Sequence, residues 1–196
     1  MSKIEFDFSN PENAIKLSFF LGNGQVVLIT SCDARKKVQG ILTASWMTPT
    51  SHFPLLLTIS VGNGREGSED DNYRSSYALI EETLEFGLNL PSKQLIEVVG
   101  KIGTLHSNQT DKYAETGLTA IDAKIIKANL IKECYLNMEC KVTDEYVTGD
   151  HTVFVAEPVF VRLDEDVFVD GKFSEKHRSK QSQVHFGDIV DMWNMW

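Results

Sequence analysis

The chain has 196 residues, of which 42% are hydrophobic and 24% are charged, and this composition excludes a disordered protein. The length fits one domain, or one domain with a small appendage. The formal net charge of −9 excludes a protein that follows the phosphate backbone of a nucleic acid, because such proteins need clustered Lys and Arg.

The N-terminal part predicts a short helix followed by strands. Asn10 can cap a helix, Pro11 suits its first position and Glu12 complements its dipole, so we expect a helix over residues 10–17. A polar turn at residues 33–37 separates two apolar runs that can pair as a hairpin. The two expected strands of this hairpin are 25–31 and 38–43, and a later apolar run predicts a third strand at 55–61.

The middle of the chain alternates between loops, short helices and a strand. Residues 62–75 (GNGREGSEDDNYRS) contain three glycines and a block of acids, which predicts a loop longer than the usual connection. One or two helical turns are expected at 76–83 and a strand at 84–90. Helical segments are then expected at 91–99, opened by Pro91, and at 111–115.

Two further strands are expected towards the C-terminus. Residues 133–142 alternate between two faces, which is typical of a half-buried antiparallel strand. The apolar face would carry Cys134, Leu136, Met138, Cys140 and Val142, and the polar face Tyr135, Asn137, Glu139 and Lys141. After a turn at 149–150, residues 151–163 predict another strand, in which Pro158 indicates a bulge or an edge.

This succession of strands with few helices, and without a βαβ rhythm, favours a β-barrel with helical decorations. Strand succession alone does not separate a barrel from a sandwich. We divide the chain into a barrel domain at residues 1–170 and an extension at 171–196. The extension ends with Phe186, Trp193 and Trp196, which we expect to pack on the barrel or on a dimer partner, because exposed aromatics forgo hydrophobic burial.

The termini and the cysteines indicate a reduced, cytoplasmic protein. Residues 1–10 lack the pattern of a signal peptide, and no stretch approaches the ~18 apolar residues of a membrane span. Cys134 and Cys140 lie on one predicted strand, where their Cα atoms would be about 20 Å apart. A disulfide requires about 7 Å or less, so we expect both to be buried small hydrophobic residues. No metal site is predicted.

No standard catalytic motif is present. The glycine pairs at 22–24 and 62–64 do not open a helix after a strand and indicate turns. Residues 43–51 (TASWMTPTS) concentrate small hydroxyls around Trp46. Such a segment is either an ordinary polar loop or a groove that satisfies the polar atoms of a flat heteroaromatic ring while the indole shields it.

Several motifs occur in an order that resembles the flavin reductase-like family of the flavoredoxin type. Residues 40–51 (GILTASWMTPTS) resemble the family's T-A-S-W-x-T-P-x-S loop. Residues 74–80 resemble its R-x-T-Y-x-L-I element and residues 111–119 (DKYAETGLT) its D-K-F-A-E-T-G-L-T element. The series continues through F-x-x-N-x-P at 86–91, E-C at 139–140 and G-D-H-T at 149–152.

The resemblance implies a mainly β, FMN-binding split β-barrel of the Greek-key type with a few peripheral helices, usually a homodimer. Carried over by position, it places the flavin ring against Thr43, Ala44, Ser45, Trp46 and Thr48, with His151 nearby. It places the phosphate near Arg74, Ser76 and Lys112. Fixed cations and hydroxyl donors suit a phosphate on an acidic chain.

Alternatives remain for some of these residues. Arg74 and Lys112 could be solvated surface charges, and His151 could be a structural histidine. Asn89 could hold the fold rather than a ligand. His52, His106, His177 and His185 have weaker claims to a site.

The sequence also departs from the family pattern. Residues 65–72 insert acidic residues that would oppose an anion unless they point to solvent. Ser76 replaces Thr but keeps the hydroxyl, and Gly40 stands where some relatives have Asn, which would remove one ring contact. The tail keeps a His-x-Gly pattern at 185–187 and then differs.

The sequence therefore predicts an FMN-dependent oxidoreductase, with non-covalent FMN taking hydride from NADH or NADPH and passing electrons to free flavin or another acceptor. In such a reaction the cofactor supplies the chemistry, and no catalytic residue is assigned. The alternatives are a flavoredoxin-like electron carrier that does not oxidise nicotinamide, which could meet a redox partner protein, and a barrel without a cofactor.

Overall fold

A computed structural model describes residues 21, 24–64, 75–107, 109–174, 184–185 and 188–189. The helix expected at 10–17, Arg74, the whole acidic insertion at 65–72 and the terminal tryptophans lie outside the described residues. No helix in the described part of the chain is long and apolar enough to cross a membrane.

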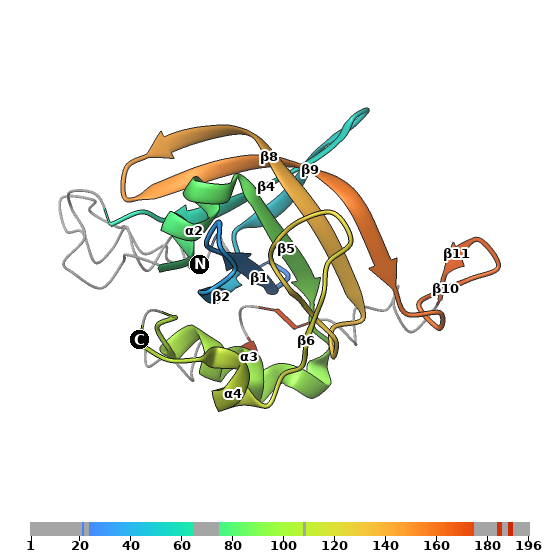
Figure 1. The fold of residues 1–196 in the computed structure, drawn as a ribbon. Coiled ribbons are helices and arrows are strands. Elements are labelled where there is room, and N and C mark those ends of the chain that lie inside the picture. The colour runs from blue at the N-terminus through green and yellow to red at the C-terminus, as the bar shows by residue number, and fades with distance from the viewer. Residues whose placement is uncertain are drawn as a thin grey trace, which may run out of the picture.

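Seven antiparallel strands form the main sheet, in the order β2-β1-β5-β8-β9-β4-β3. Their bounds are β1 Val27–Cys32, β2 Gln39–Ala44, β3 Met47–His52, β4 Leu55–Gly62, β5 Glu85–Leu90, β8 Leu136–Thr148 and β9 His151–Leu163. Two small ribbons pair β6 (Ala120–Ile121) with β7 (Leu130–Ile131) and β10 (Phe168–Val169) with β11 (Lys172–Phe173). The sheet curls, so that β8 and β9 arch over β1, β2 and β5 (Figure 1).

Helices close the curled sheet on two sides. Helix α2 (Ser75–Thr83) lies under the β8–β9 hairpin, whereas α3 (Ile96–Thr104) and α4 (Lys112–Thr116) lie together on the other side (Figure 1). A short 3-10 helix, η1 (Lys93–Leu95), leads into α3. The helical segments expected at 76–83, 91–99 and 111–115 are therefore present, with shifted ends.

Strand β1 is buried along its whole length because both of its faces are covered. Val27 and Ile29 face the barrel interior, together with side chains of β4, β5, β8, β9 and α2. Val26 and Leu28 face a second cluster, built with α3. The predicted hairpin pairs β1 with β2 from Val27↔Ala44 to Cys32↔Gln39.

The second cluster also contains two residues near the C-terminus, Val184 and Ile189, both fully buried. The amide of Val26 donates a hydrogen bond to the carbonyl of Val184 at 2.8 Å. Val184 and Ile189 of the extension therefore pack on the same chain, while a domain boundary at residue 170 stays a prediction.

Strand β9 spans the predicted residues, and its register with β8 shifts at Pro158, so the expected bulge is confirmed. The segment 43–51 is not simply a loop. Residues 47–52 form the edge strand β3, which pairs with β4. The composition of this segment, rich in Thr and Ser, concealed the strand.

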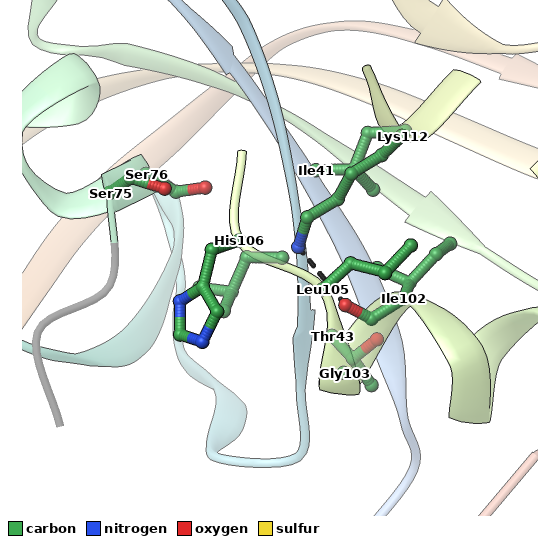
Figure 2. A pocket seen from close by; sticks show the side chains of 10 residues that line it. Ile41, Thr43, Ser75, Ser76, Ile102, Gly103, Leu105, His106 and Lys112 are labelled. Carbon is green, nitrogen blue, oxygen red and sulfur yellow. Dashed lines mark hydrogen bonds between the residues drawn. The ribbon is translucent and has the colours of Figure 1, made fainter. Parts of the chain in front are cut away.

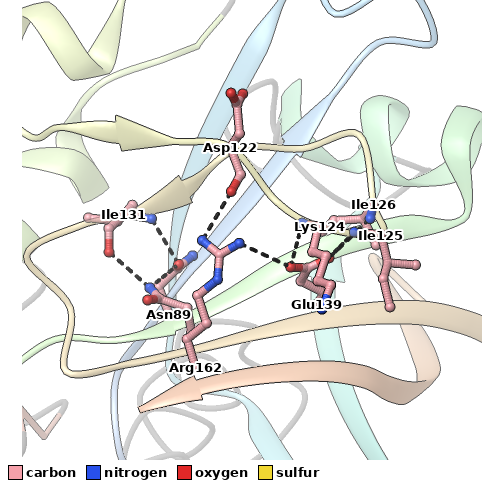
Figure 3. Close-up of polar contacts among 9 residues, drawn as sticks. Asn89, Asp122, Lys124, Ile125, Ile126, Ile131, Glu139 and Arg162 are labelled. Atoms are coloured by element: carbon pink, nitrogen blue, oxygen red, sulfur yellow. Dashed lines mark hydrogen bonds and ion pairs between the residues drawn. The ribbon is translucent and has the colours of Figure 1, made fainter. Parts of the chain in front are cut away.

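The prediction of a solvent-facing polar side for residues 133–142 is wrong in part, because Tyr135, Asn137 and Glu139 are buried. The segment 122–131 covers this face (Figure 3). The carboxylate of Glu139 is fully buried and accepts hydrogen bonds from three successive backbone amides of that segment, those of Lys124, Ile125 and Ile126. A buried polar side chain is tolerated when it is hydrogen-bonded.

The three cysteines are free and buried, as expected for Cys134 and Cys140. Burial raises the pKa of Cys32 to about 11 and that of Cys140 to about 12. Burial also raises the pKa of Cys134 above its ordinary range. These thiols are small core residues and not nucleophiles, because the reactive species is the thiolate.

Candidate functional site

A pocket of about 50 Å³ opens where β2, α2 and the α3–α4 connection meet (Figure 2). Its volume corresponds to a few water molecules, at roughly 10–15 Å³ for each, which is the scale of one phosphate group. Its lining residues are Ile41, Leu42, Thr43, Ser75, Ser76, Ile102, Gly103, Leu105, His106 and Lys112. No Asp or Glu is among the described residues that line it.

Lys112 brings a cation to this pocket from the first turn of α4. Asp111 caps that helix by accepting hydrogen bonds from the amides of Tyr113 and Ala114 at 3.0 and 3.2 Å. The side chain of Lys112 is buried, and its Nζ donates a hydrogen bond to the carbonyl of Ile102 at 3.0 Å. A cation in a weakly solvated position attracts an anion more strongly than a surface lysine does.

Helix α2 starts at the same pocket with two hydroxyl residues, Ser75 and Ser76. The first amides of a helix have no partner within the helix, and the helix dipole favours an anion at this end. The start of α2 lies close to β2, because a Cβ added at Gly40 would stand 3.0 Å from Ser76 Oγ and 2.9 Å from Ser31 Oγ. Gly40 therefore makes room for Ser76 at the pocket.

Trp46 and His151 form a second group. Their ring centroids lie 4.7 Å apart and the rings are tilted by 34°. Nδ1 of His151 lies 2.9 Å from Oδ1 of Asp150, and this contact fixes the orientation of the imidazole. The turn before β9 is anchored by Asn63, whose Nδ2 donates to Thr152 Oγ1 at 3.1 Å and to Gly149 O at 3.4 Å.

Comparison with known proteins identifies the family. The family model described as "Flavin reductase like domain" matches residues 22–177. This chain belongs to the flavin reductase-like family.

The fold of this flavin reductase-like chain is shared by several solved structures. A flavoredoxin from Methanosarcina acetivorans is 20% identical, with a TM-score of 0.71 over 90% of this chain and 83% of that one. A Shewanella frigidimarina protein described as a flavin reductase with a split barrel domain is 16% identical, with a TM-score of 0.72 over 93% and 91%. An FMN-binding protein from Thermus thermophilus is 15% identical, with a TM-score of 0.68 over 89% and 86%. The fold is therefore a mainly β split barrel, as the sequence predicted.

The structure of this flavin reductase-like chain groups the predicted site residues in two places. Thr43, Ser76 and Lys112 line the pocket, whereas Trp46 and His151 are in contact with each other. Thr43 lines the pocket, and its hydroxyl donates to Val99 O at 2.9 Å and so joins β2 to α3; its expected place beside a flavin ring stays a prediction. Binding of a flavin by these residues stays a prediction.

Three other predicted residues do not line the pocket. Ala44 is buried in the barrel core, and Ser45 is partly exposed between β2 and β3. Thr48 is exposed on β3. Arg74 lies outside the described residues.

Asn89 is a structural residue. It is fully buried and donates hydrogen bonds from Nδ2 to Leu28 O and Thr30 Oγ1 at 3.0 and 3.2 Å. Its Oδ1 accepts from Ile131 N and Asn137 Nδ2 at 3.1 and 2.9 Å. These bonds join β1, β5, β7 and β8, which supports the fold-holding alternative.

Sequence reasoning did not assign Ser75 to the site and gave His106 only a weak claim, yet both line the pocket. Ser75 precedes Ser76 in the recognised motif and could have been included. His106 follows α3 in a turn whose direction no local pattern gives, so only the folded chain brings it to the pocket.

Proposed function

We propose that this chain binds FMN non-covalently, with the phosphate in the Lys112 pocket, and acts as an FMN-dependent oxidoreductase. The observation that carries the proposal is the buried ammonium of Lys112 in a pocket with hydroxyl groups and no carboxylate among its described lining. A phosphate carries a charge of about −1.5 to −2 near neutral pH. On a chain with a net charge of −9, it needs such a local site.

The residues present fit a phosphate. An ammonium provides three N–H donors, and Ser75 and Ser76 add two hydroxyls from another element. The start of α2 adds the positive end of a helix dipole. The volume of about 50 Å³ suits one such group.

The ring end of the flavin would lie towards Trp46 and His151. When bound, the flavin supplies the exchange of hydride and electrons, and the protein supplies position and electrostatics. Asp150 accepts a hydrogen bond from Nδ1 of His151, which in a neutral imidazole leaves Nε2 as the acceptor. Trp46 offers an indole ring that can border the flavin and limit the access of water.

The first test compares FMN with riboflavin, which lacks the phosphate. Replacing Lys112 by Ala should weaken FMN binding about 10- to 100-fold and leave riboflavin binding nearly unchanged, because hydrogen bonds to charged groups contribute about 1.5–3 kcal/mol. Lys101→Ala is the matched control. Lys101 is exposed and contacts Glu115, and such surface pairs contribute about 0–1 kcal/mol.

Equal losses for the two flavins in Lys112→Ala would mean that Lys112 only supports the end of α3 through its bond to Ile102. Such a result would contradict the assignment of Lys112 to the phosphate site. Titration of flavin fluorescence measures both affinities.

The second test separates a reductase from an electron carrier. We propose that the bound FMN takes hydride from NADH or NADPH and passes electrons to free flavin or another acceptor. Rapid bleaching of the flavin on stopped-flow mixing with either nucleotide would support this proposal. Inertness towards both would favour the flavoredoxin-like carrier, for which the flavoredoxin with a TM-score of 0.71 is the supporting observation.

The assembly and location belong to the same proposal. We propose a homodimer, on the resemblance to this family, and a cytoplasmic protein, because its three free cysteines are usual in a reducing compartment. Sedimentation analysis with and without FMN measures the mass. A monomer under both conditions would refute the dimer.

A further inference from the structure

We propose that His106 is a ligand of the anion pocket and increases its preference for a phosphate-bearing flavin over riboflavin. This inference rests on the proposed function. It assigns a pocket role to a residue that lies outside the recognised motifs.

The backbone of His106 is fixed on both sides. Helix α3 ends at Leu105, which has the extended angles φ −99° and ψ 151° and donates a hydrogen bond to Ile102 O at 3.3 Å. The carbonyl of His106 then accepts from the amides of Gln109 and Thr110 at 3.0 and 3.1 Å. The next residue, Asp111, caps α4. The turn therefore fixes the backbone of His106 at the pocket that Lys112 also lines.

The imidazole faces the pocket. His106 lines the pocket together with Ser75, Ser76 and Lys112, and Figure 2 shows its ring below the two serines and to the lower left of the ammonium of Lys112. The ring is partly exposed, and no hydrogen bond joins it to a residue that the structure describes. It can therefore reorient towards a ligand without breaking a bond to the described part of the chain.

The ring supplies a donor to an otherwise apolar wall. The neighbouring lining residues on this side are Ile102, Gly103 and Leu105. Lys112 and the serines approach from α4 and α2, so His106 adds a third direction. A tetrahedral phosphate has oxygens in several directions, and donors from three elements can satisfy more of them than donors from two. An imidazole has an N–H donor whether it is neutral or charged.

The experiment measures affinities for FMN and riboflavin in three variants. His106→Leu removes the donor at similar size, and His106→Gln keeps an N–H donor. His52→Leu is the control, because His52 is exposed on β3 and does not line the pocket. We expect His106→Leu to weaken FMN binding about tenfold or more with riboflavin binding unchanged, since this matches one hydrogen bond to a charged group. His106→Gln should lose less and His52→Leu nothing.

A second measurement uses the unmodified protein and so does not depend on the folding of a variant. The imidazole signals of His106 in ¹H–¹⁵N spectra should shift on addition of FMN and shift much less with riboflavin.

Two results would overturn the inference about His106 and leave the proposed function standing. In the first, the unmodified protein prefers FMN and the His106→Leu variant keeps the same preference. In the second, addition of FMN does not shift the His106 signals. An unmodified protein with no preference for FMN over riboflavin would overturn the proposed phosphate site, and this inference with it.

Discussion

Replacement of Glu139 by Gln should destabilise the fold strongly, although the two side chains have nearly the same shape. Oε1 accepts from Lys124 N at 2.8 Å, and Oε2 accepts from Ile125 N and Ile126 N at 2.6 and 3.1 Å (Figure 3). A glutamine has one carbonyl oxygen, so its amide group must face at least one of these N–H donors. At least one of these donors, which are buried or partly buried, then loses its acceptor.

The size of the effect follows from the number of bonds. Each buried group left without a partner costs about 1–3 kcal/mol, and one or two are affected. The nearby guanidinium of Arg162, with Nη2 3.9 Å from Oε1, also loses its negative partner. We therefore expect the free energy of unfolding to fall by about 2–4 kcal/mol, where each kcal/mol lowers the Tm by about 2–4 °C for a protein of this size.

Urea unfolding followed by tryptophan fluorescence measures the change. Glu145→Gln is the matched control, because Glu145 is exposed on the same strand, and such surface substitutions change stability by about 0.5 kcal/mol or less. If the free energy of unfolding of Glu139→Gln changes no more than that of this control, the packing of segment 122–131 does not depend on the carboxylate, and the proposed role of Glu139 is wrong.

Three further predictions concern the packing around the pocket and the core. Gly40→Ala should cost about 1–3 kcal/mol and weaken FMN binding, because the new Cβ would stand 3.0 Å from Ser76 Oγ; unchanged urea midpoint and affinity would contradict this. Tyr113→Phe should leave stability unchanged or raise it by about 1 kcal/mol, since its buried hydroxyl has no hydrogen-bond partner among the described residues; a clear loss in the same assay would show that a partner exists. Thiol labelling at pH 8 should be slow in folded protein and reach three groups in urea, because burial raises the pKa of every cysteine and keeps it protonated at that pH; fast labelling of folded protein would refute this for Cys32, Cys134 and Cys140.

Local patterns were sufficient for six of the seven strands of the main sheet and for much of the helical structure that the structure describes. The apolar run at β1 and the turn after it predicted the first hairpin, and Pro158 indicated the bulge in β9. Alternation failed for β8, because burial there depends on a separate segment that folds over Glu139. The edge strand β3 was missed because its polar side chains resemble a loop.

Site residues could be predicted from the sequence only where they lie in a recognised family motif. The resemblance brought Lys112 and Ser76 into one hypothesis, and both line the same pocket. The bond from the hydroxyl of Thr43 to the carbonyl of Val99 was not predicted, since it depends on how α3 packs on β2. The position of His106 at the pocket depends on the direction of the turn after α3, which the sequence alone does not predict.

The most direct test of a flavin in the Lys112 pocket is the visible absorption spectrum of freshly purified protein, followed by identification of any chromophore released on denaturation. We expect a flavin band and the release of FMN, about one per chain. Protein that is colourless and takes up no FMN on titration would contradict the proposed cofactor, and the proposed oxidoreductase activity with it.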